Sequence, residues 1–544
     1  MGMLWKKISA LVLALLMVSA LAATGLSEDN VTAPGEYPIA KEPVELTVFV
    51  TARPNVDDFV NNTATKYLEE KLGIKLKFVV APDEEARQKL NLLFSTGDYP
   101  DVILGTWKLS RTEVDYYSAQ GLFIPLDDLI EEYGVNTKKV FEEYPYAVTF
   151  STMSDGLIHT LPDVVDGMHT SGSMKIWYYQ PFLDALGMEI PTTTEEFVTY
   201  LKAVKDNDPN GNGVADEVPA AGSLYGWHSY PVDYLLQAFL YNDPAGARLR
   251  VTEDGVVETI ASTEEFREGL RFIKSLVDEG LLDKNTFTQD LNSLIMLSEN
   301  SPDPILGVSW GGFEGSFADL SGSRWKDWVI GPPLEGPEGV SYSYFNPDYA
   351  YYLKSAITST CENPEIAFRF IDALYDREIY MNTQIGVEGE HWAWAEEGEE
   401  GYAGEGVWKR LVSSGDVPPN THWDQNGNMF QNDAFRIGEV IDVEADPMES
   451  ILYFGTVDYY VPTRPSIDIL YPALVVPTED DAQEMSSLEV DISTKIAEMM
   501  VRFIVGEADL DADWDAYVND LEAAGMSRYL ELKQKSYDEY LKTK

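Results

Sequence analysis

The stretch DNDPNGNGVADEVP, residues 206–219, has the residue types and spacing of a loop that binds a hard cation. Oxygen-bearing side chains alternate along it, followed by a backbone carbonyl and then by carboxylates, as in calcium-binding loops. The stretch contains no His or Cys, and an all-oxygen ligand set favours Ca²⁺. The predicted ligands are Asp208, Asn210, Asn212, the carbonyl oxygen of Val214, Asp216 and Glu217.

This loop departs from an EF-hand at its last position. Pro219 stands where a bidentate Glu would be, so the adjacent carboxylates at 216 and 217 must supply the late ligands. Gly211 and Gly213 permit the positive φ values that folding around an ion requires. The alternative is an Asn/Gly turn after a helix. We predict a structural Ca²⁺ in a loop at 208–217.

A second chemical motif is GVSWG, residues 307–311, which matches the G-x-S-x-G nucleophile elbow of hydrolases. That elbow needs a strand before Ser309, a helix after it, and then an acid and a His. His391 and His422 lie downstream. The following WGGFEGSF, residues 310–317, is poor helix material with three glycines. We therefore favour a glycine-lined loop that displays its aromatic residues, with a Ser309 hydrolase as the alternative.

Aromatic residues are plentiful, with 12 Trp and 31 Tyr. Flat aromatic faces pack against the C–H faces of sugars, while neighbouring polar groups bind hydroxyls. The alternative for each ring is a place in the core or at its rim. No spacing among the 92 Asp and Glu residues singles out a glycosidase pair, and none of the five His lies in an HExxH motif. The predicted ligand-binding residues are Trp107, Trp177, Trp227, Trp310, Phe313 and Trp423.

Strand and helix patterns alternate after residue 43. VELTVFVT (44–51), IKLKFVVA (74–81) and DVILG (101–105) are typical of buried strands. The intervening helices end at Gly73 and Gly97, the favoured residue after a helix. Strand–helix–strand–helix–strand order predicts an α/β fold with a parallel sheet covered on both faces.

The N-terminus is typical of a secretory signal peptide over residues 1–22, with basic, apolar and Ala-Leu-Ala cleavage regions. A polar leader, residues 23–43, is predicted to be a flexible tether. Leu26 stands where a bacterial lipoprotein would have Cys, which argues against a lipid anchor. No later stretch is apolar for long enough to cross a bilayer. We expect a secreted or cell-surface protein.

Composition excludes several classes of function. With a formal net charge of −53 over 544 residues, binding to nucleic acid or to an anionic membrane is disfavoured. The single cysteine, Cys361, permits no intramolecular disulfide. A secreted chain of this size without disulfides indicates a bacterial product that relies on its own core.

Five segments together resemble the extracellular solute-binding proteins of ABC transporters, family 1, in particular the large Gram-positive and alginate-binding branch. They recur in the family's order across residues 44–530. The third is the most specific, because its N-D-P-N-G-N-G loop follows a P-T-T-x-E-E-F helix. The segments are TKYLEEKLGIKLKF, LLFSTGDYPDVIL, YYQPFLDALGMEIPTTTEEFVTYLKAVKDNDPNGNGVADEVP, NPEIAFRFIDALYD and GVEGEHW.

The resemblance implies a two-lobed periplasmic-binding-protein-like fold, with ligand held in a cleft between lobes that close around it. It implies a carbohydrate ligand, delivery to membrane permease subunits, calcium in the Asp/Asn loop, and a stacking Trp near Trp310. We expect one lobe from 44–160 with 354–400, and the other from 161–353 with 401–544, which carries the loop.

We therefore predict a non-enzymatic, monomeric binding protein that captures an oligosaccharide for import. The alternatives are a secreted hydrolase that uses Ser309 and a binding protein for a peptide or another small solute.

Overall fold

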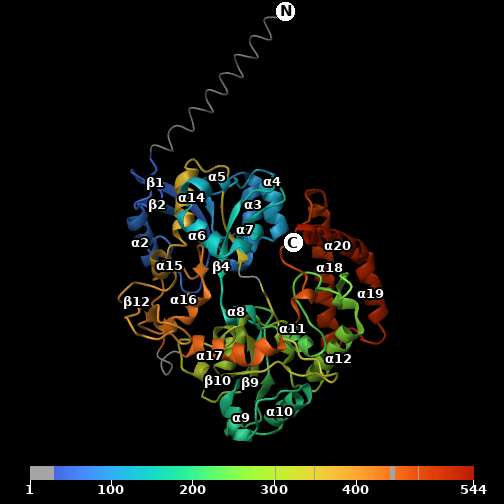
Figure 1. Ribbon diagram of the computed structural model, residues 1–544. Helices are drawn as coiled ribbons and strands as arrows, with labels where there is room; N and C mark the ends of the chain where they lie inside the picture. Colours follow the sequence, from blue (N-terminus) through green and yellow to red (C-terminus); the bar gives the residue numbers. More distant parts are fainter. Residues whose placement is uncertain (1–29, 301, 348–349, 442–446, 476, 544) are drawn as a thin grey trace, which may run out of the picture. The chain divides into compact units, whose positions relative to one another are not determined.

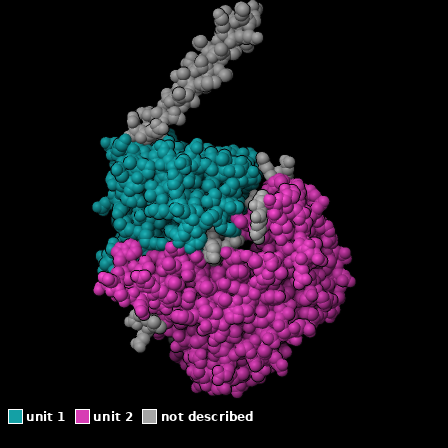
Figure 2. Space-filling view, in the orientation of Figure 1, with its two compact units in different colours: residues 1–165, 350–393, 417–430 teal, residues 166–349, 394–416, 431–544 magenta. Residues whose placement is uncertain are grey.

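The computed structural model describes residues 30–300, 302–347, 350–441, 447–475 and 477–543. The chain divides into two compact units, each assembled from three separate segments (Figure 2). The predicted two-lobed α/β class is confirmed. Unit 1 comprises Met1–Val165, Ala350–Ala393 and Val417–Phe430, and unit 2 comprises Asp166–Tyr349, Trp394–Asp416 and Gln431–Lys544.

Unit 1 is built on a six-stranded sheet in the order β14-β4-β11-β3-β1-β2. Figure 1 labels β1, β2 and β4 of this sheet. β1 pairs in parallel with both β2 and β3, and β11 is antiparallel to β3 and to β4. The three predicted strands are confirmed, because apolar, β-branched runs become strands that the sheet buries. The strands are β1 (Val44–Thr51), β2 (Ile74–Ala81), β3 (Val102–Ile103), β4 (Thr160–Val165), β11 (Ala350–Ile357) and β14 (Phe430–Gln431).

The helices of unit 1 begin and end at local signals. The Asn62 side chain accepts a hydrogen bond from the Ala64 amide at the start of α2, and Gly73 and Gly97 end α2 and α3 with φ of 69° and 72°. A left-handed glycine satisfies the last helical carbonyls. The helices are α2 (Thr63–Leu72), α3 (Ala86–Thr96), α4 (Arg111–Ala119), α5 (Asp127–Tyr133), α6 (Val135–Glu143), α7 (Pro145–Ser151), α14 (Pro364–Ala373) and α15 (Arg377–Gln384).

Unit 2 has a four-stranded sheet in the order β10-β5-β9-β6, and helices from the middle and the end of the chain complete it. β9 is central, parallel to β6 and antiparallel to β5, and all of its residues are buried. The strands are β5 (Lys175–Tyr179), β6 (Val218–Ala220), β9 (Leu306–Gly311) and β10 (Trp328–Gly331). The main helices are α9 (Gln180–Leu186), α10 (Thr194–Asp206), α12 (Glu264–Asp278), α18 (Glu479–Val505), α19 (Trp514–Ala523) and α20 (Met526–Thr543).

Residues 417–430 lie in unit 1, whereas the sequence placed them in the second lobe. Asn420 accepts a hydrogen bond at its carbonyl from the Thr63 amide, 2.9 Å away. Trp423 is fully buried, and its indole N–H donates to Thr65 Oγ1 at 2.8 Å. These contacts join positions more than 350 residues apart, so local sequence patterns could not reveal them.

The leader is not a flexible tether over residues 30–41. Arg369 is buried and donates to the carbonyls of Thr32 and Glu36 at 2.7 and 2.6 Å. Ile39 is fully buried. The prediction of flexibility for 23–43 is therefore wrong for this part, because a buried guanidinium and an apolar anchor fix it.

The predicted signal peptide (1–22) and Leu26 lie outside the described residues. Within the part of the chain that the structure describes, no helix has the length and apolar character needed to span a membrane.

We predict that Arg369→Met releases the leader. The change removes the donor from the part-buried carbonyls of Thr32 and Glu36 and from the buried carbonyl of Ile39, which costs about 2–3 kcal/mol. Hydrogen exchange should show faster exchange at residues 30–41, and denaturant unfolding should show the lost stability. Arg271→Met is the control, because that side chain is 39% exposed in its surface ion pairs. Unchanged exchange at 30–41 in the Arg369 variant would contradict the assignment.

Candidate ligand-binding site and calcium loop

The parallel strands of unit 1 bring chemistry-bearing side chains to one edge of the sheet. Arg53 follows β1, Asp83 follows β2, and Trp107 and Lys108 follow β3. The carboxyl ends of parallel strands are the usual ligand-binding edge of an α/β sheet. We name the following residues the strand-end cluster: Arg53, Asp83, Trp107, Lys108, Asp163, Tyr352 and Lys354.

Ion pairs connect the charged members of this cluster. Lys108 Nζ lies 2.5 Å from Asp83 Oδ2, and Arg53 Nη1 lies 3.5 Å from Asp83 Oδ1. Lys354 Nζ lies 3.1 Å from Asp163 Oδ2, with side chains only 3% and 0% exposed. Burial lowers the pKa of Lys354 and raises the pKa of Asp163, and the attraction between the two opposes both shifts. The cluster thus contains one buried ion pair, Lys354–Asp163, and a more accessible group of charges around Asp83.

Trp107 lies among the cations of the cluster. Lys108 Nζ is 4.0 Å from its ring centroid, the Arg53 guanidinium carbon 5.0 Å and Lys354 Nζ 5.4 Å. The Tyr352 ring is 5.9 Å away and 43% exposed, so it can offer a face to a ligand. Sequence reasoning found Trp107 and missed the other members. Of the members that were missed, only Arg53, Asp83 and Lys108 could have been found from the sequence, because they follow closely after predicted strands.

Unit 2 presents a separate aromatic set: Trp227, His228, Phe313 and Tyr344. The Trp227 ring is 37% exposed and lies 5.3 Å from the His228 ring and 6.2 Å from the Phe313 ring. A Cβ at Gly312 would meet a Trp227 ring carbon at 2.2 Å, so this ring position requires a glycine beneath it. His228 has φ of 59°, a strained backbone state that clusters at functional sites. The predicted pair Trp227 and Phe313 therefore lies together.

Three predicted ligand-binding tryptophans are instead fully buried in the cores of their units: Trp177, Trp310 and Trp423. The predicted loop around Trp310 is wrong, because Trp310 lies in β9, opposite Ile176 of β5. A central strand is buried on both faces and shows no polar alternation in its sequence. Their own chain covers these rings, so they stabilise the fold and have no free face for a sugar.

Ser309 also lies inside β9 and not at a strand-to-helix turn. Its hydroxyl is buried and donates to the Ala221 carbonyl at 3.0 Å. His391 and His422 belong to unit 1, while Ser309 belongs to unit 2. The interpretation of GVSWG as a nucleophile elbow is therefore wrong.

The predicted calcium loop, residues 208–217, connects α10 to β6. Asp208 accepts hydrogen bonds from the Asn212 and Gly213 amides at 3.0 and 2.7 Å, and Asn212 Oδ1 accepts from the Val214 amide at 2.7 Å. Gly211 and Gly213 have φ of 72° and 79°, as their positions require.

Glu217 tests whether this loop suits a cation. Both of its carboxylate oxygens are enclosed, and neither receives a hydrogen bond of normal geometry. Burial raises the pKa of Glu217 and the charges of Asp208 and Asp216 raise it further, while the nearby backbone amides of Glu217 and Asn210 partly oppose the rise. A bound cation would satisfy these oxygens, so the donor set fits Ca²⁺. Among the described residues, no three His, Cys, Asp or Glu side chains are gathered as a metal site.

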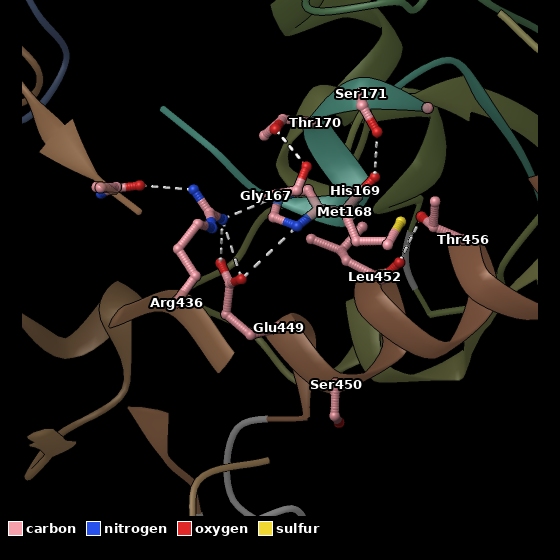
Figure 3. A network of polar contacts seen from close by, with 12 residues as sticks. Gly167, Met168, His169, Thr170, Ser171, Arg436, Glu449, Ser450, Leu452 and Thr456 are labelled. Atoms are coloured by element: carbon pink, nitrogen blue, oxygen red, sulfur yellow. Dashed lines mark hydrogen bonds and ion pairs between the residues drawn. The ribbon is translucent and has the colours of Figure 1, made fainter. Parts of the chain in front are cut away.

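A polar network fixes two segments near the places where the chain enters unit 2 (Figure 3). Arg436, from α16 (Asp433–Ile437), lies 3.0 Å from Glu449 of α17 (Met448–Gly455) and donates to Gln431 at 2.6 Å. Arg436 Nη2 also lies 3.0 Å from Nε2 of His169, in α8 (Met168–Ser171). Burial lowers the pKa of His169 well below its usual value, so the neutral ring accepts this bond.

The family model for bacterial extracellular solute-binding proteins matches residues 53–381. The chain belongs to this family.

A curated relative is the fructooligosaccharide ABC transporter substrate-binding protein FusA of Streptococcus pneumoniae. It is 30% identical over 482 residues, which cover 87% of this chain and 86% of that protein. The solved structure of FusA in complex with kestose has a TM-score of 0.78 and 26% identity, and covers 92% of this chain and 100% of its own. A FusA EF-hand mutant in complex with fructo-nystose aligns with the same values.

The solved structure of a human-milk-oligosaccharide (HMO)-binding solute-binding protein of Bifidobacterium longum infantis supports the fold alone. It has a TM-score of 0.74 at 21% identity, and covers 92% of this chain and 99% of its own.

We predict that His228 makes unit 2 sensitive to acid. Burial lowers the pKa of His228 to about 3, and its Nε2 lies 2.8 Å from Ser173 Oγ. The unfolded state, with a pKa of about 6.5, therefore takes up the proton first as the pH falls. Stability contributed by the neutral ring is complete above about pH 6.5 and is lost toward pH 3, by about 2 kcal/mol at pH 5.

His228→Asn should reduce the difference in unfolding free energy between pH 7 and pH 5 by about this 2 kcal/mol, measured by denaturant titration. Asn tolerates the positive φ. Ser173→Ala leaves the imidazole in place, so this variant should retain most of the decrease in unfolding free energy between pH 7 and pH 5. An equal acid loss in the Asn variant and in the wild type would contradict the prediction.

Proposed function

We propose that this protein captures an oligosaccharide outside the cell and passes it, chemically unchanged, to ABC permease subunits. The supporting observation is the strand-end cluster, in which the 43% exposed Tyr352 lies against Trp107, beside the Arg53–Asp83 ion pair at the ligand-binding edge of the sheet. The relative FusA is described as binding fructooligosaccharides, which supports a sugar ligand. We expect a monomer to perform this function.

The chemistry of capture follows from the side chains. The Tyr352 face would pack on the C–H face of a sugar ring, as aromatic residues do in carbohydrate sites. Polar side chains beside Tyr352 supply hydrogen bonds to the oxygen atoms of the sugar. Trp227 and Phe313 of unit 2 form a second aromatic surface of the same character.

The binding proposal predicts that Tyr352→Ala weakens oligosaccharide affinity at least tenfold, about 1.4 kcal/mol. Isothermal titration with kestose and a panel of other trisaccharides would measure the affinity, and chromatography would check that each sugar is recovered intact. Tyr116→Ala is the matched control, because Tyr116 is a 50% exposed tyrosine on α4 of the same unit.

Two results would contradict this proposal. The first is release of product that depends on Ser309, tested with Ser309→Ala. The second is no binding of any sugar combined with binding of peptides.

We also infer that the calcium loop holds one structural Ca²⁺. The ligands would be Asp208, Asn210, Asn212, the Val214 carbonyl, Asp216 and Glu217. The ion would balance the carboxylates that raise the pKa of Glu217. Asn210 donates to the Pro304 carbonyl at 3.1 Å, so an ordered loop also supports the segment before β9. The FusA EF-hand mutant indicates an EF-hand in that relative.

Chelation should lower the melting temperature by about 4 °C. Binding at a Ca²⁺ concentration of 100 times Kd contributes about 2.7 kcal/mol, and 1 kcal/mol shifts the melting temperature by about 1.5 °C in a unit of roughly 300 residues. Asp208→Asn and Glu217→Gln should abolish the response to EDTA and to added Ca²⁺. Asp254→Asn, in the turn between β7 (Leu249–Val251) and β8 (Val257–Thr259), is the control. An unchanged response in both loop variants would place the ion elsewhere.

A further inference from the structure

The strand-end cluster has a charge balance opposite to that of the whole chain. The sequence contains 39 Lys and Arg against 92 Asp and Glu. The cluster nevertheless brings together three cations, Arg53, Lys108 and Lys354, around one indole ring. Its carboxylates are two, Asp83 and Asp163. A local positive excess in a strongly acidic protein needs a physical reason.

The excess positive charge is on the solvent-accessible residues of the cluster. Lys354 is committed to Asp163 in a buried pair and also donates to the Gln425 carbonyl at 2.7 Å. Arg53 and Lys108 remain, 20% and 18% exposed, and they share the single carboxylate of Asp83. Two cations that share one carboxylate still repel each other, and a further anion between them would offset this repulsion.

A surface group elsewhere in the chain provides a comparison. Arg267 and Arg271 likewise share Asp511, but each has a second carboxylate, Glu264 or Glu268. In that group carboxylates outnumber cations. In the strand-end cluster, the ion pairs of Arg53 and Lys108 are both with Asp83, and neither cation has an ion pair with a second carboxylate.

The cluster also contains hydrogen-bond donors that have no acceptor. The Arg53 Nε–H and the Trp107 indole N–H are both enclosed without an acceptor. Asp83 Oδ1 and Asp163 Oδ2 are enclosed without a hydrogen bond as well, but each lies beside a cation, 3.5 Å from Arg53 and 3.1 Å from Lys354. Enclosed donors are nearly always paired in a folded protein, so these two indicate a ligand that supplies oxygen acceptors. A carboxylate only accepts, at two oxygens, whereas a hydroxyl brings a donor with each acceptor.

We propose that the strand-end cluster binds the carboxylate of an acidic sugar, so that the captured oligosaccharide contains uronate units. This inference rests on the proposed function, of which it specifies the substrate class. Arg53 provides the planar guanidinium that carboxylates favour, Lys108 provides a point charge, and Trp107 provides the third donor. Tyr352 packs on the ring of the same sugar unit.

The test compares two trisaccharides that differ only at carbon 6. Trigalacturonate and the galactotriose of the same linkage are titrated calorimetrically into the full protein at pH 7, in 20 mM and then 200 mM salt. We expect trigalacturonate to bind at least tenfold more tightly, and we expect this preference to shrink at the higher salt because screening weakens exposed charge pairs.

Variants separate charge recognition from hydroxyl recognition. Arg53→Gln and Lys108→Gln should each weaken trigalacturonate at least tenfold, while any binding of galactotriose changes less than threefold. Asp83→Asn should tighten trigalacturonate, because it removes the competing carboxylate. If Asp83 instead binds hydroxyls, the same variant weakens both sugars. Arg271→Gln makes the same charge change in unit 2 and should have no effect.

Equal or tighter binding of galactotriose, no binding of trigalacturonate at 1 mM, or weakening of trigalacturonate by Asp83→Asn would each overturn the inference. The titration with kestose and the other trisaccharides tests the proposed function independently. If a neutral sugar binds and Tyr352→Ala weakens its binding, the proposed function is supported even where the inference about acidic sugars fails. Melting temperatures show whether each variant folds, and Asp83→Asn provides an independent answer if a cation variant does not.

Discussion

In unit 1, β1 hydrogen-bonds in parallel to β2 on one side and to β3 on the other. This shared direction sends the chain out of all three strands at the same edge, and the first polar residues after each strand meet there. Arg53, Asp83 and Trp107 are far apart in sequence, yet they converge without any special loop. The candidate site is thus a consequence of strand direction, and the helices between the strands only keep that direction fixed.

In unit 2, aromatic residues that the sequence suggests for ligand binding are instead packed in the core. β9 is enclosed by β5 and β6, so Trp310 fills core volume and Ser309 forms an internal hydrogen bond. Burying a large ring stabilises the folded state more than leaving it exposed. Trp227 keeps an exposed face because it lies on a loop, held by Gly312 and by neighbouring rings. Aromatic content alone therefore does not locate a binding surface.

Features encoded locally were predictable from the sequence. The runs that became β1 and β2, the glycines that end α2 and α3, and the connection between α10 and β6 all carry their signals within a few residues. Trp107 was found among the tryptophans for the same reason. By contrast, the place of residues 417–430 and of Arg369 depends on contacts across hundreds of residues. No spacing rule joins Lys354 to Asp163, because only strand pairing brings them together.

The discontinuous make-up of unit 1 also sets an order for its folding. Its last segment ends at residue 430 of 544, and this segment supplies Trp423 to the core and Asn420 to the start of α2. During vectorial synthesis, the first strands therefore emerge long before their final packing partners. They must stay soluble as an incomplete unit in the meantime, when unpaired strands are prone to aggregate. The abundant negative charge gives such an unfinished chain the mutual repulsion that keeps it apart from its neighbours.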